Sequence, residues 1–264
     1  MSRNYLLAPL RLIAFILWVI LMPLIFIIVR ALRIPGHENM VHWFHAGLRR
    51  ILGIHIHISG TISEATPCLY VSNHISYLDI IVLGDLRAYF IAKSEVASWP
   101  VFGQLARFQN TLFIERKASR AREQMKIMQN HLSSGKRLTL FPEGTSTDGA
   151  HVEPFKSSLF AAADLPNPEQ RVPIQAVTIA YVLHDGKPMN QGMRDHYAWY
   201  ATMPFASHFF SLFPLKKVDV NIHFHPVCYL DEFESRKACA DHCQSLVAAK
   251  LSKSLSEALH TPSI

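Results

Sequence analysis

The feature that most constrains this chain is an uncharged apolar run near its start. It extends from Leu12 to Val29 (LIAFILWVILMPLIFIIV), eighteen residues with arginines on both sides. As a helix, this run is barely one bilayer thickness long. It exceeds the apolar region of a usual signal peptide, and no convincing small-residue cleavage site follows it. We therefore expect a retained membrane anchor. A helix buried in the protein core is the less favoured alternative, because a half-buried helix needs fewer apolar residues.

Charge and a central proline refine the expected anchor. Pro23 would kink a helix, so a full span and a bent, hairpin-like segment in one leaflet both stay open. Residues 1–50 hold six arginines and one acid, Glu38, which accounts for +5 of the formal net charge of +6. Basic residues around an apolar segment suit anionic lipids. Without zinc-finger spacing or a basic stripe interleaved with aromatics, we expect no nucleic-acid partner.

The rest of the chain alternates short apolar strands with helical stretches. Two domains are expected: residues 1–50 as membrane anchor and amphipathic helix, and residues 51–264 as one catalytic domain. Such alternation predicts an α/β fold, with a mixed, largely parallel sheet flanked by helices. Strands are expected at 69–71, 88–92, 111–115, 137–141 and 172–182, and helices at 119–134 and from about 232 to 260.

The four cysteines are too few and too irregularly spaced for a disulfide scaffold, so the catalytic part is expected to face a reducing compartment. Cys239 and Cys243 are four residues apart in a predicted helix, with His242 beside them. A metal site would need a second pair of ligands with matching spacing. Because the sequence has no such pair, we expect buried, packed side chains and no metal.

Two ionisable side chains follow the predicted strand at 69–71. His74 and Asp79 would lie about 140° apart on an ideal helix, so they meet only if the chain bends between them. In one interpretation, Asp79 completes a helix cap that starts at Ser76. In the other, Asp79 orients the imidazole of His74 so that its second nitrogen accepts a proton from a hydroxyl. The chain has no G-x-S-x-G motif, so this hydroxyl would belong to the substrate.

A loop rich in turn residues, FPEGTSTDG (141–149), follows the predicted strand at 137–141. Its proline and glycines predict a tight turn that aims Glu143 outward, with Thr145 and Ser146 beside it, where it could hold a polar head group. A plain turn with a solvated glutamate is the alternative. Lys156 lies at an apparent helix start, where free amides and a lysine favour an anion.

A charged segment, ERKASRAR (115–122), follows the predicted strand at 111–115. Such a run is usually one exposed helix face. Arg116 is nearest the strand end, where it could reach a cleft and bind an anionic group through two parallel hydrogen bonds.

Four segments resemble the four sequence blocks of the glycerolipid acyltransferase family, which includes 1-acylglycerol-3-phosphate acyltransferase, and they occur in the family's order. They are NHISYLD (73–79), LFIER (112–116), FPEGT (141–145) and VPIQAVTIAY (172–181). The resemblance implies that His74 is the general base and that Asp79 orients it. A lipid hydroxyl would then attack an acyl thioester of coenzyme A or acyl carrier protein, with no further cofactor.

The same resemblance implies which residues bind substrate and where the enzyme works. Asn73, Arg116, Glu143 and Gly144 would help to bind the acceptor, and Pro173 would belong to a block that shapes the acyl or acceptor site. Family members work at the membrane surface, so membrane lipids are expected partners. We expect the catalytic domain on the cytoplasmic face of the membrane.

One position departs from the family pattern. The third block commonly continues Glu-Gly-Thr-Arg, but here Ser146 follows Thr145, and a neutral hydroxyl cannot replace a charge-assisted phosphate contact. FPEGTSTDG and AWYATMPFASHFF (198–210) are similar to lyso-ornithine-lipid acyltransferases, whose acceptor is a phosphate-free amino lipid.

The main expectation is a lysolipid O-acyltransferase acting on 1-acyl-sn-glycerol-3-phosphate or a similar lysolipid, with lyso-ornithine lipid as the alternative acceptor. A lipid hydrolase and a noncatalytic lipid-binding protein are the alternatives of other classes. Donor, chain length and oligomeric state stay open.

Overall fold

The structure is a computed structural model that describes residues 6–36, 39–109, 111–115, 118–167 and 169–260. Within these residues, eight strands form one sheet in the order β1-β8-β6-β2-β5-β3-β4, with β7 beside β6. The strands are β1 (Ile54–Gly60), β2 (Cys68–Ser72), β3 (Tyr89–Lys93), β4 (Leu112–Ile114), β5 (Arg137–Leu140), β6 (Ile174–His184), β7 (Lys187–Pro188) and β8 (Val218–Cys228).

The predicted mixed, largely parallel sheet is confirmed. β1 with β8, β2 with β5 and β6, and β3 with β4 and β5 all pair in parallel. β6 pairs antiparallel with β7 and β8. Because β2, β5 and β3 are parallel neighbours, the loops after their carboxyl ends meet at one edge of the sheet.

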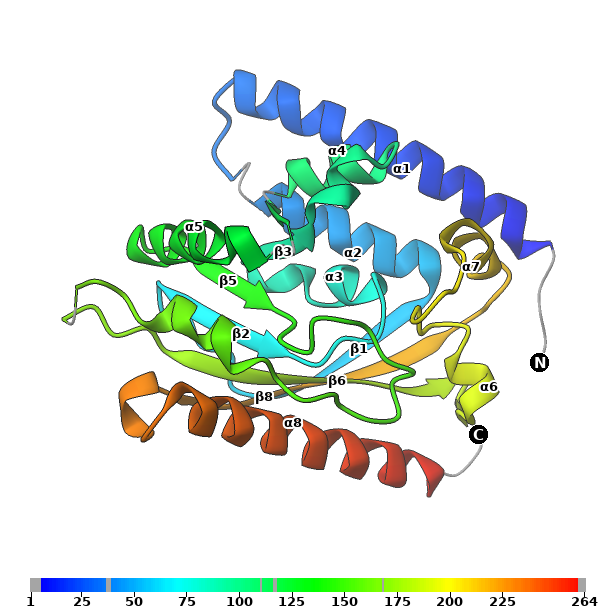
Figure 1. Cartoon of the computed structure of the whole chain (residues 1–264). Coiled ribbons are helices and arrows are strands. Elements are labelled where there is room, and N and C mark those ends of the chain that lie inside the picture. Colours follow the sequence, from blue (N-terminus) through cyan, green and yellow to red (C-terminus); the bar gives the residue numbers. More distant parts are fainter. Residues whose placement is uncertain (1–5, 37–38, 110, 116–117, 168, 261–264) are drawn as a thin grey trace.

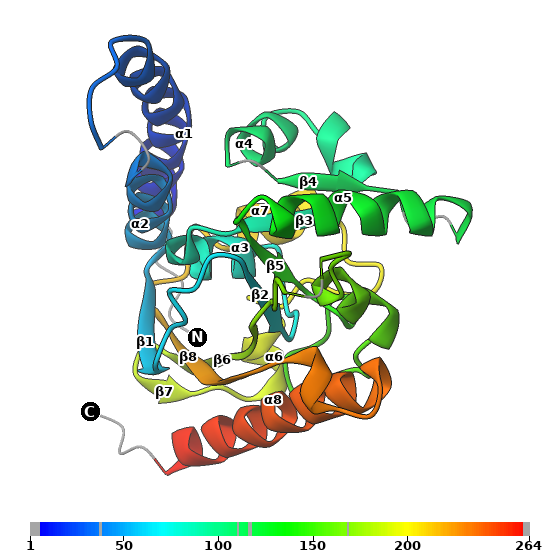
Figure 2. The same ribbon diagram turned by 90° about the vertical axis from the view of Figure 1, so that its left-hand side faces the viewer.

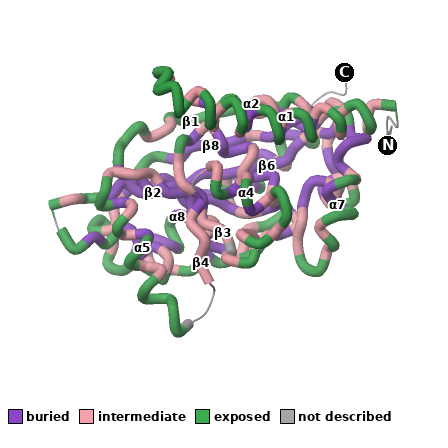
Figure 3. The backbone as a smooth tube through the Cα atoms, turned by 90° about the horizontal axis from the view of Figure 1, so that it is seen from above, coloured by how far each residue is buried: buried purple, intermediate pink, exposed green. Residues whose placement is uncertain are grey.

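Helices cover both faces of the sheet (Figure 1). The α8 helix lies on one face, while α2 and α3 lie on the other. Buried residues concentrate in the strands, and exposed residues in the outer helices (Figure 3). The helices are α1 (Leu7–Ala31), α2 (Met40–Leu52), α3 (Leu78–Val82), α4 (Phe102–Phe108), α5 (Ala121–Ser133), α6 (Gln191–Arg194), α7 (Phe205–Ser211) and α8 (Arg236–Leu259), with short 3-10 turns at 84–86, 94–98, 118–120, 157–163 and 230–232.

The last helix begins later than the sequence predicted. Residues 230–232 form a separate 3-10 turn, and α8 starts at Arg236. The side chain of Ser235 accepts a hydrogen bond from the backbone N–H of Ala238 at 3.1 Å, which caps α8. This local contact fixes a start that apolar periodicity alone did not locate.

The N-terminal apolar run forms one continuous helix, α1, that includes Pro23. The hairpin-like bend considered for this run is therefore absent. Among the described residues, α1 is the one helix long and apolar enough to cross a membrane. Only Phe15, Val19 and Met22 of α1 are buried, while side chains such as Leu17 (52% exposed) face outward. This exposure excludes the alternative of a buried core helix.

The α1 helix packs against α2 at one side of the molecule (Figure 2). The indole Nε1 of Trp18 donates a hydrogen bond to the backbone oxygen of Phe44 at 3.0 Å. A Cβ at Gly47 would collide with the ring of Trp18, so a glycine permits this close approach. The guanidinium of Arg11 donates to the carbonyls of Leu215 and Lys216, just before β8. These contacts attach α1 directly to the globular part of the chain.

Candidate active site

The candidate site lies where the loops after β2 and β5 meet. The β2 strand leads into Asn73 and His74, and β5 leads into the loop that carries Glu143. The backbone N–H of Thr147 donates to the carbonyl of His74 at 2.9 Å, which joins the two loops. The backbone N–H of His74 also donates to the side chain of Glu143, so the first and third sequence blocks are in direct contact.

The imidazole of His74 and the carboxylate of Asp79 point toward each other. The Nδ1 atom of His74 lies 2.9 Å from Oδ2 of Asp79. The His74 side chain is 22% exposed, whereas Asp79 is fully buried. The bend needed to bring the two residues together comes from the turn at 73–77, before α3 begins. The structure thus brings together the pair that the sequence singled out.

The carboxylate of Asp79 is surrounded by hydrogen-bond donors. Its Oδ2 accepts from the backbone N–H of Ile75 at 2.7 Å and of Ser76 at 3.0 Å. Its Oδ1 accepts from the hydroxyl of Tyr181 at 3.0 Å. Because these partners all donate, Asp79 acts as an acceptor toward His74 as well, and Nδ1 carries the hydrogen. In a neutral imidazole with this tautomer, the second nitrogen, Nε2, carries no hydrogen and can accept one.

Asp79 makes a contact expected from each of its two interpretations. The bond from the N–H of Ser76 is the backbone contact expected of a capping acid, and the bond to His74 orients the ring. The cap itself falls one residue later than predicted, since Tyr77 precedes the first helical residue of α3. One buried carboxylate therefore both starts a helix and holds an imidazole.

A second contact fixes the plane of the His74 ring. The ring of Phe141, at the end of β5, stacks on it with a centroid distance of 4.2 Å and an interplanar angle of 17°. The imidazole is thus held at one edge by Asp79 and on one face by Phe141. These two contacts restrict the ring to one orientation.

Glu143 does not point outward as the sequence predicted, because it is only 3% exposed. Its Oε1 accepts from the backbone N–H of His74 at 2.6 Å, and its Oε2 accepts from that of Glu153 at 2.7 Å. Burial raises the pKa of Glu143 to about 8, although the two amide bonds act in the opposite direction. The alternative of a solvated turn glutamate is also wrong. In this structure, Glu143 holds the backbone of His74 in place.

Asn73 and Pro173 lie in backbone junctions of the sheet. Asn73 is fully buried; its amide donates to the carbonyl of Ile179 at 2.9 Å and accepts from the N–H of Ile179 at 2.8 Å. The carbonyl of Pro173 accepts from the N–H of Leu69 at 2.9 Å. Both residues therefore hold β2 beside β6, and their substrate-binding roles stay predictions.

The other predicted binding residues that the structure describes lie in the segment that follows β5. Gly144 has a φ of 75°, which favours glycine, and a Cβ there would collide with the side chain of Lys156. Thr145 and Lys156 are exposed. The backbone N–H of Lys156 donates to the carbonyl of Pro142 at 2.9 Å, so this amide is not free for an anion. Arg116 lies outside the described residues.

The structure connects the β5 loop with the segment AWYATMPFASHFF. The hydroxyl of Ser146 donates to the carbonyl of Trp199, and the N–H of Trp199 donates to the carbonyl of Ile75 at 3.0 Å. The ring of Tyr77 contacts those of Trp199 and Phe205 at centroid distances of 5.8 and 5.0 Å. An aromatic, apolar wall therefore lies beside the loop that carries His74.

Sequence reasoning missed two contributors to the site. Tyr181 is the last residue of the fourth block, but nothing in its spacing indicates that its hydroxyl reaches Asp79 across the sheet. Phe141 immediately precedes the proline of the third block, and its position at a strand end was the available signal. Neither stacking nor a contact between β6 and the β2 loop follows from local sequence.

The site is thus a partly exposed imidazole held by a buried carboxylate, on an α/β sheet that also carries a long apolar helix. The chain belongs to the acyltransferase family, and the family described as Acyltransferase matches residues 53–182. The chain is 35% identical to a lyso-ornithine lipid O-acyltransferase of Brucella abortus, over 83% of this chain and 84% of that protein. A lyso-ornithine lipid O-acyltransferase of Rhodobacter capsulatus is 36% identical, over 75% of this chain and 70% of that protein.

Two further matches have a phosphate-bearing acceptor in their name. A 1-acyl-sn-glycerol-3-phosphate acyltransferase of Neisseria gonorrhoeae is 30% identical, over 69% of this chain and 68% of that protein. The crystal structure of the 1-acyl-sn-glycerophosphate acyltransferase PlsC from Thermotoga maritima matches with a TM-score of 0.69 and 18% identity, over 95% of both chains. This match confirms the fold. The protein is a lysolipid acyltransferase, and its substrates are an acyl donor and a lipid acceptor. The apolar helix α1 is consistent with membrane association.

Proposed function

We propose that this enzyme transfers an acyl chain from acyl-CoA or acyl carrier protein to the free hydroxyl of a lyso-ornithine lipid. Similarity to the lyso-ornithine enzymes favours this acceptor over 1-acyl-sn-glycerol-3-phosphate, which was the main expectation from sequence. The observation that carries the proposal is the bond from Ser146 to Trp199. It joins the two segments that resemble lyso-ornithine-lipid acyltransferases, at the position where the phosphate-acceptor enzymes commonly have arginine.

The chemistry follows from the orientation of His74. Its Nε2 removes the proton of the lipid hydroxyl while the oxygen attacks the thioester carbonyl. The carbon–sulfur bond then breaks, and Nε2 donates the proton to the departing thiolate. Asp79 stabilises the imidazolium that forms between these two transfers. The products are an ester and a free thiol, and no acyl group is attached to the protein.

The site is proposed to work at the cytoplasmic face of a membrane, where acyl thioesters are available. Residues 1–50 would serve as the anchor, and the exposed face of α1 offers apolar side chains to lipid tails. The aromatic wall beside His74 would cover the acyl chains. Lys156 and Thr145 would remain near the polar head group, and Arg116 stays a predicted ligand of the same group.

A direct competition tests the acceptor. Purified enzyme in detergent micelles receives lyso-ornithine lipid and lysophosphatidic acid side by side, each with labelled acyl-CoA or acyl carrier protein. We expect kcat/KM for lyso-ornithine lipid to exceed that for lysophosphatidic acid at least tenfold, about 1.4 kcal/mol. Equal or greater turnover of lysophosphatidic acid would overturn the proposed acceptor. Release of free fatty acid without ester would show a hydrolase instead.

Substitution of Ser146 provides a second test on the same substrates. Ser146→Arg restores a cation where phosphate-acceptor enzymes commonly carry one, so it should raise relative turnover of lysophosphatidic acid. Ser146→Thr keeps the hydroxyl and is the matched control. If both variants lower both activities equally, then position 146 acts only through the fold and not through the choice of acceptor.

A further inference from the structure

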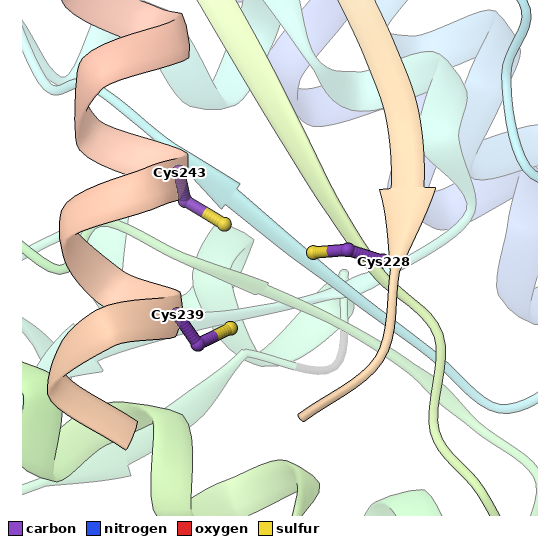
Figure 4. Close-up of side chains that lie close together, drawn as sticks. All are labelled: Cys228, Cys239 and Cys243. Carbon is purple, nitrogen blue, oxygen red and sulfur yellow. The ribbon is translucent and has the colours of Figure 1, made fainter. Parts of the chain in front are cut away.

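A cluster of three cysteines lies far along the chain from His74, in the region where β8 ends and α8 begins. Cys228 is the last residue of β8, and Cys239 and Cys243 are one helical turn apart on α8 (Figure 4). All three are buried, and their sulfur atoms lie within 4.8 Å of one another. Figure 4 shows the three side chains pointing toward a common centre.

The sequence did not predict that the sulfur of Cys228 would lie beside those of Cys239 and Cys243. Cys239 and Cys243 alone fit a packed helix face, and no second ligand pair is spaced to match them. The fold adds Cys228, because α8 packs on the sheet beside the end of β8. Three convergent thiols differ from two packed ones, since they can surround a single ion.

The distances suit one bound ion. Thiolates bind metals at about 2.3 Å, so three of them around one ion lie about 4 Å apart. Sulfur atoms within 4.8 Å of one another therefore need to move together by less than about 1 Å. Small rotations of the cysteine side chains, without movement of β8 or α8, would achieve this.

The surroundings select a soft, three-coordinate ion. The three cysteines belong to a buried hydrophobic cluster that also contains Val172 and Val247, and Phe233 packs against this cluster. No fourth His, Cys, Asp or Glu joins the group within the part of the chain that the structure describes. His242 is exposed, and its ring packs against Phe233 at 5.2 Å. Zn²⁺ in a structural site takes four ligands, whereas all-thiolate sites with fewer ligands suit Cu(I).

Negative charge on these sulfurs has support from α8. Cys239 lies in the second turn of this 24-residue helix, near its positive end. Arg236 and Lys237 open the same helix. This is the end of the helix at which negative charge is least costly.

We propose that Cys228, Cys239 and Cys243 form a three-coordinate thiolate site for one soft metal ion, Cu(I) foremost, that fastens α8 to the end of β8. Each thiol that binds the ion releases its proton, and the ion keeps its oxidation state. The site is separate from the acyl-transfer site and adds a metal-dependent element to the fold. Binding to the folded chain alone stabilises that state.

The test is an anaerobic titration of the full-length, reduced protein with Cu(I) against a competing copper chelator. We expect one equivalent of Cu(I) per chain, and X-ray absorption showing only sulfur neighbours, three in number. At a hundredfold excess of free ion over Kd, the midpoint of thermal unfolding should rise by roughly 5 °C or more. Cys239→Ala should abolish stoichiometric binding, while Cys68→Ala, at a buried cysteine outside the cluster, should retain it.

Three results would overturn the proposal as a whole, and a fourth would overturn its coordination number. The three are failure of the wild-type chain to compete with the chelator, coordination that includes nitrogen or oxygen, and stoichiometric binding that survives in folded Cys239→Ala. Tighter binding of Zn²⁺ with a fourth ligand would overturn the three-coordinate assignment. Because the spectroscopic readout uses the wild-type chain, it decides the question even if Cys239→Ala fails to fold.

Discussion

Removal of one hydroxyl, in Tyr181→Phe, tests whether the buried carboxylate positions the catalytic imidazole. Tyr181 is fully buried, so it cannot touch substrate, and its hydroxyl donates to Oδ1 of Asp79 at 3.0 Å. The phenylalanine ring fills the same space and leaves one carboxylate oxygen without a donor. Asp79 is then free to rotate, and His74 loses part of its fixed orientation.

The size of the effect follows from the strength of that bond. A hydrogen bond to a charged group contributes about 1.5–3 kcal/mol. If the loss falls entirely on the transition state, then kcat decreases about 10- to 150-fold. Because Tyr181 acts through Asp79 and not on the substrate, KM should change less than about twofold. Tyr181 is thus a positioning residue, and the change should appear in kcat.

Steady-state kinetics with labelled acyl donor and saturating acceptor measures this effect. Tyr197→Phe is the matched control, because Tyr197 is also buried and stacks on Tyr181 with a centroid distance of 6.0 Å. Its hydroxyl bonds to His184 and not to Asp79. Circular dichroism verifies that both variants are folded. Wild-type kcat in Tyr181→Phe, or an equal loss in Tyr197→Phe, would refute the reasoning.

Three further changes test other parts of the structure. His74→Ala should abolish ester formation and leave membrane binding intact, as vesicle flotation measures; substantial residual turnover would contradict its role as base. Folding raises the pKa of Glu143 from about 4.5 to about 8, so as the pH rises Glu143 loses its proton in the unfolded chain before it does so in the folded chain. Between these two pH values the free energy of unfolding falls, by at most about 1.4 kcal/mol per pH unit. The stability that protonated Glu143 contributes is fully lost above pH 8. Urea unfolding should show this slope in the wild type and not in Glu143→Gln, whereas parallel curves would count against the shift. Gly47→Ala should lower stability by about 1–3 kcal/mol, because the new methyl group collides with Trp18. Gly192→Ala, where the nearest atom is 3.7 Å away, should fold normally, and equal unfolding midpoints for the two would exclude tight α1–α2 packing.

The sequence predicted most of the sheet because apolar strands alternate with amphipathic helices along the chain. It also located His74 and Asp79, since both residues belong to one short segment. The direction of Glu143 was wrong because its environment depends on two amides, from His74 and Glu153, that the fold brings to it. Local turn propensity does not contain that information.

Contacts between distant residues account for the rest. The bond from Tyr181 to Asp79 spans 102 positions, and the bond from Ser146 to Trp199 spans 53. Cys228 joins the other two cysteines only when α8 packs on the sheet. A single sequence shows which side chains have suitable chemistry, but strand order decides which of them meet.

The bonds from Arg11 to Leu215 and Lys216 bear on how the enzyme reaches its lipids. A helix joined to its enzyme by a slack linker would allow many heights above the bilayer. Here the guanidinium joins α1 to the body that carries the imidazole of His74. If α1 lies in the membrane as proposed, then the imidazole stays at one depth of the lipid layer, and a lysolipid would have to present its hydroxyl at that level. Under this proposal, depth in the bilayer would select among acceptors alongside head-group chemistry.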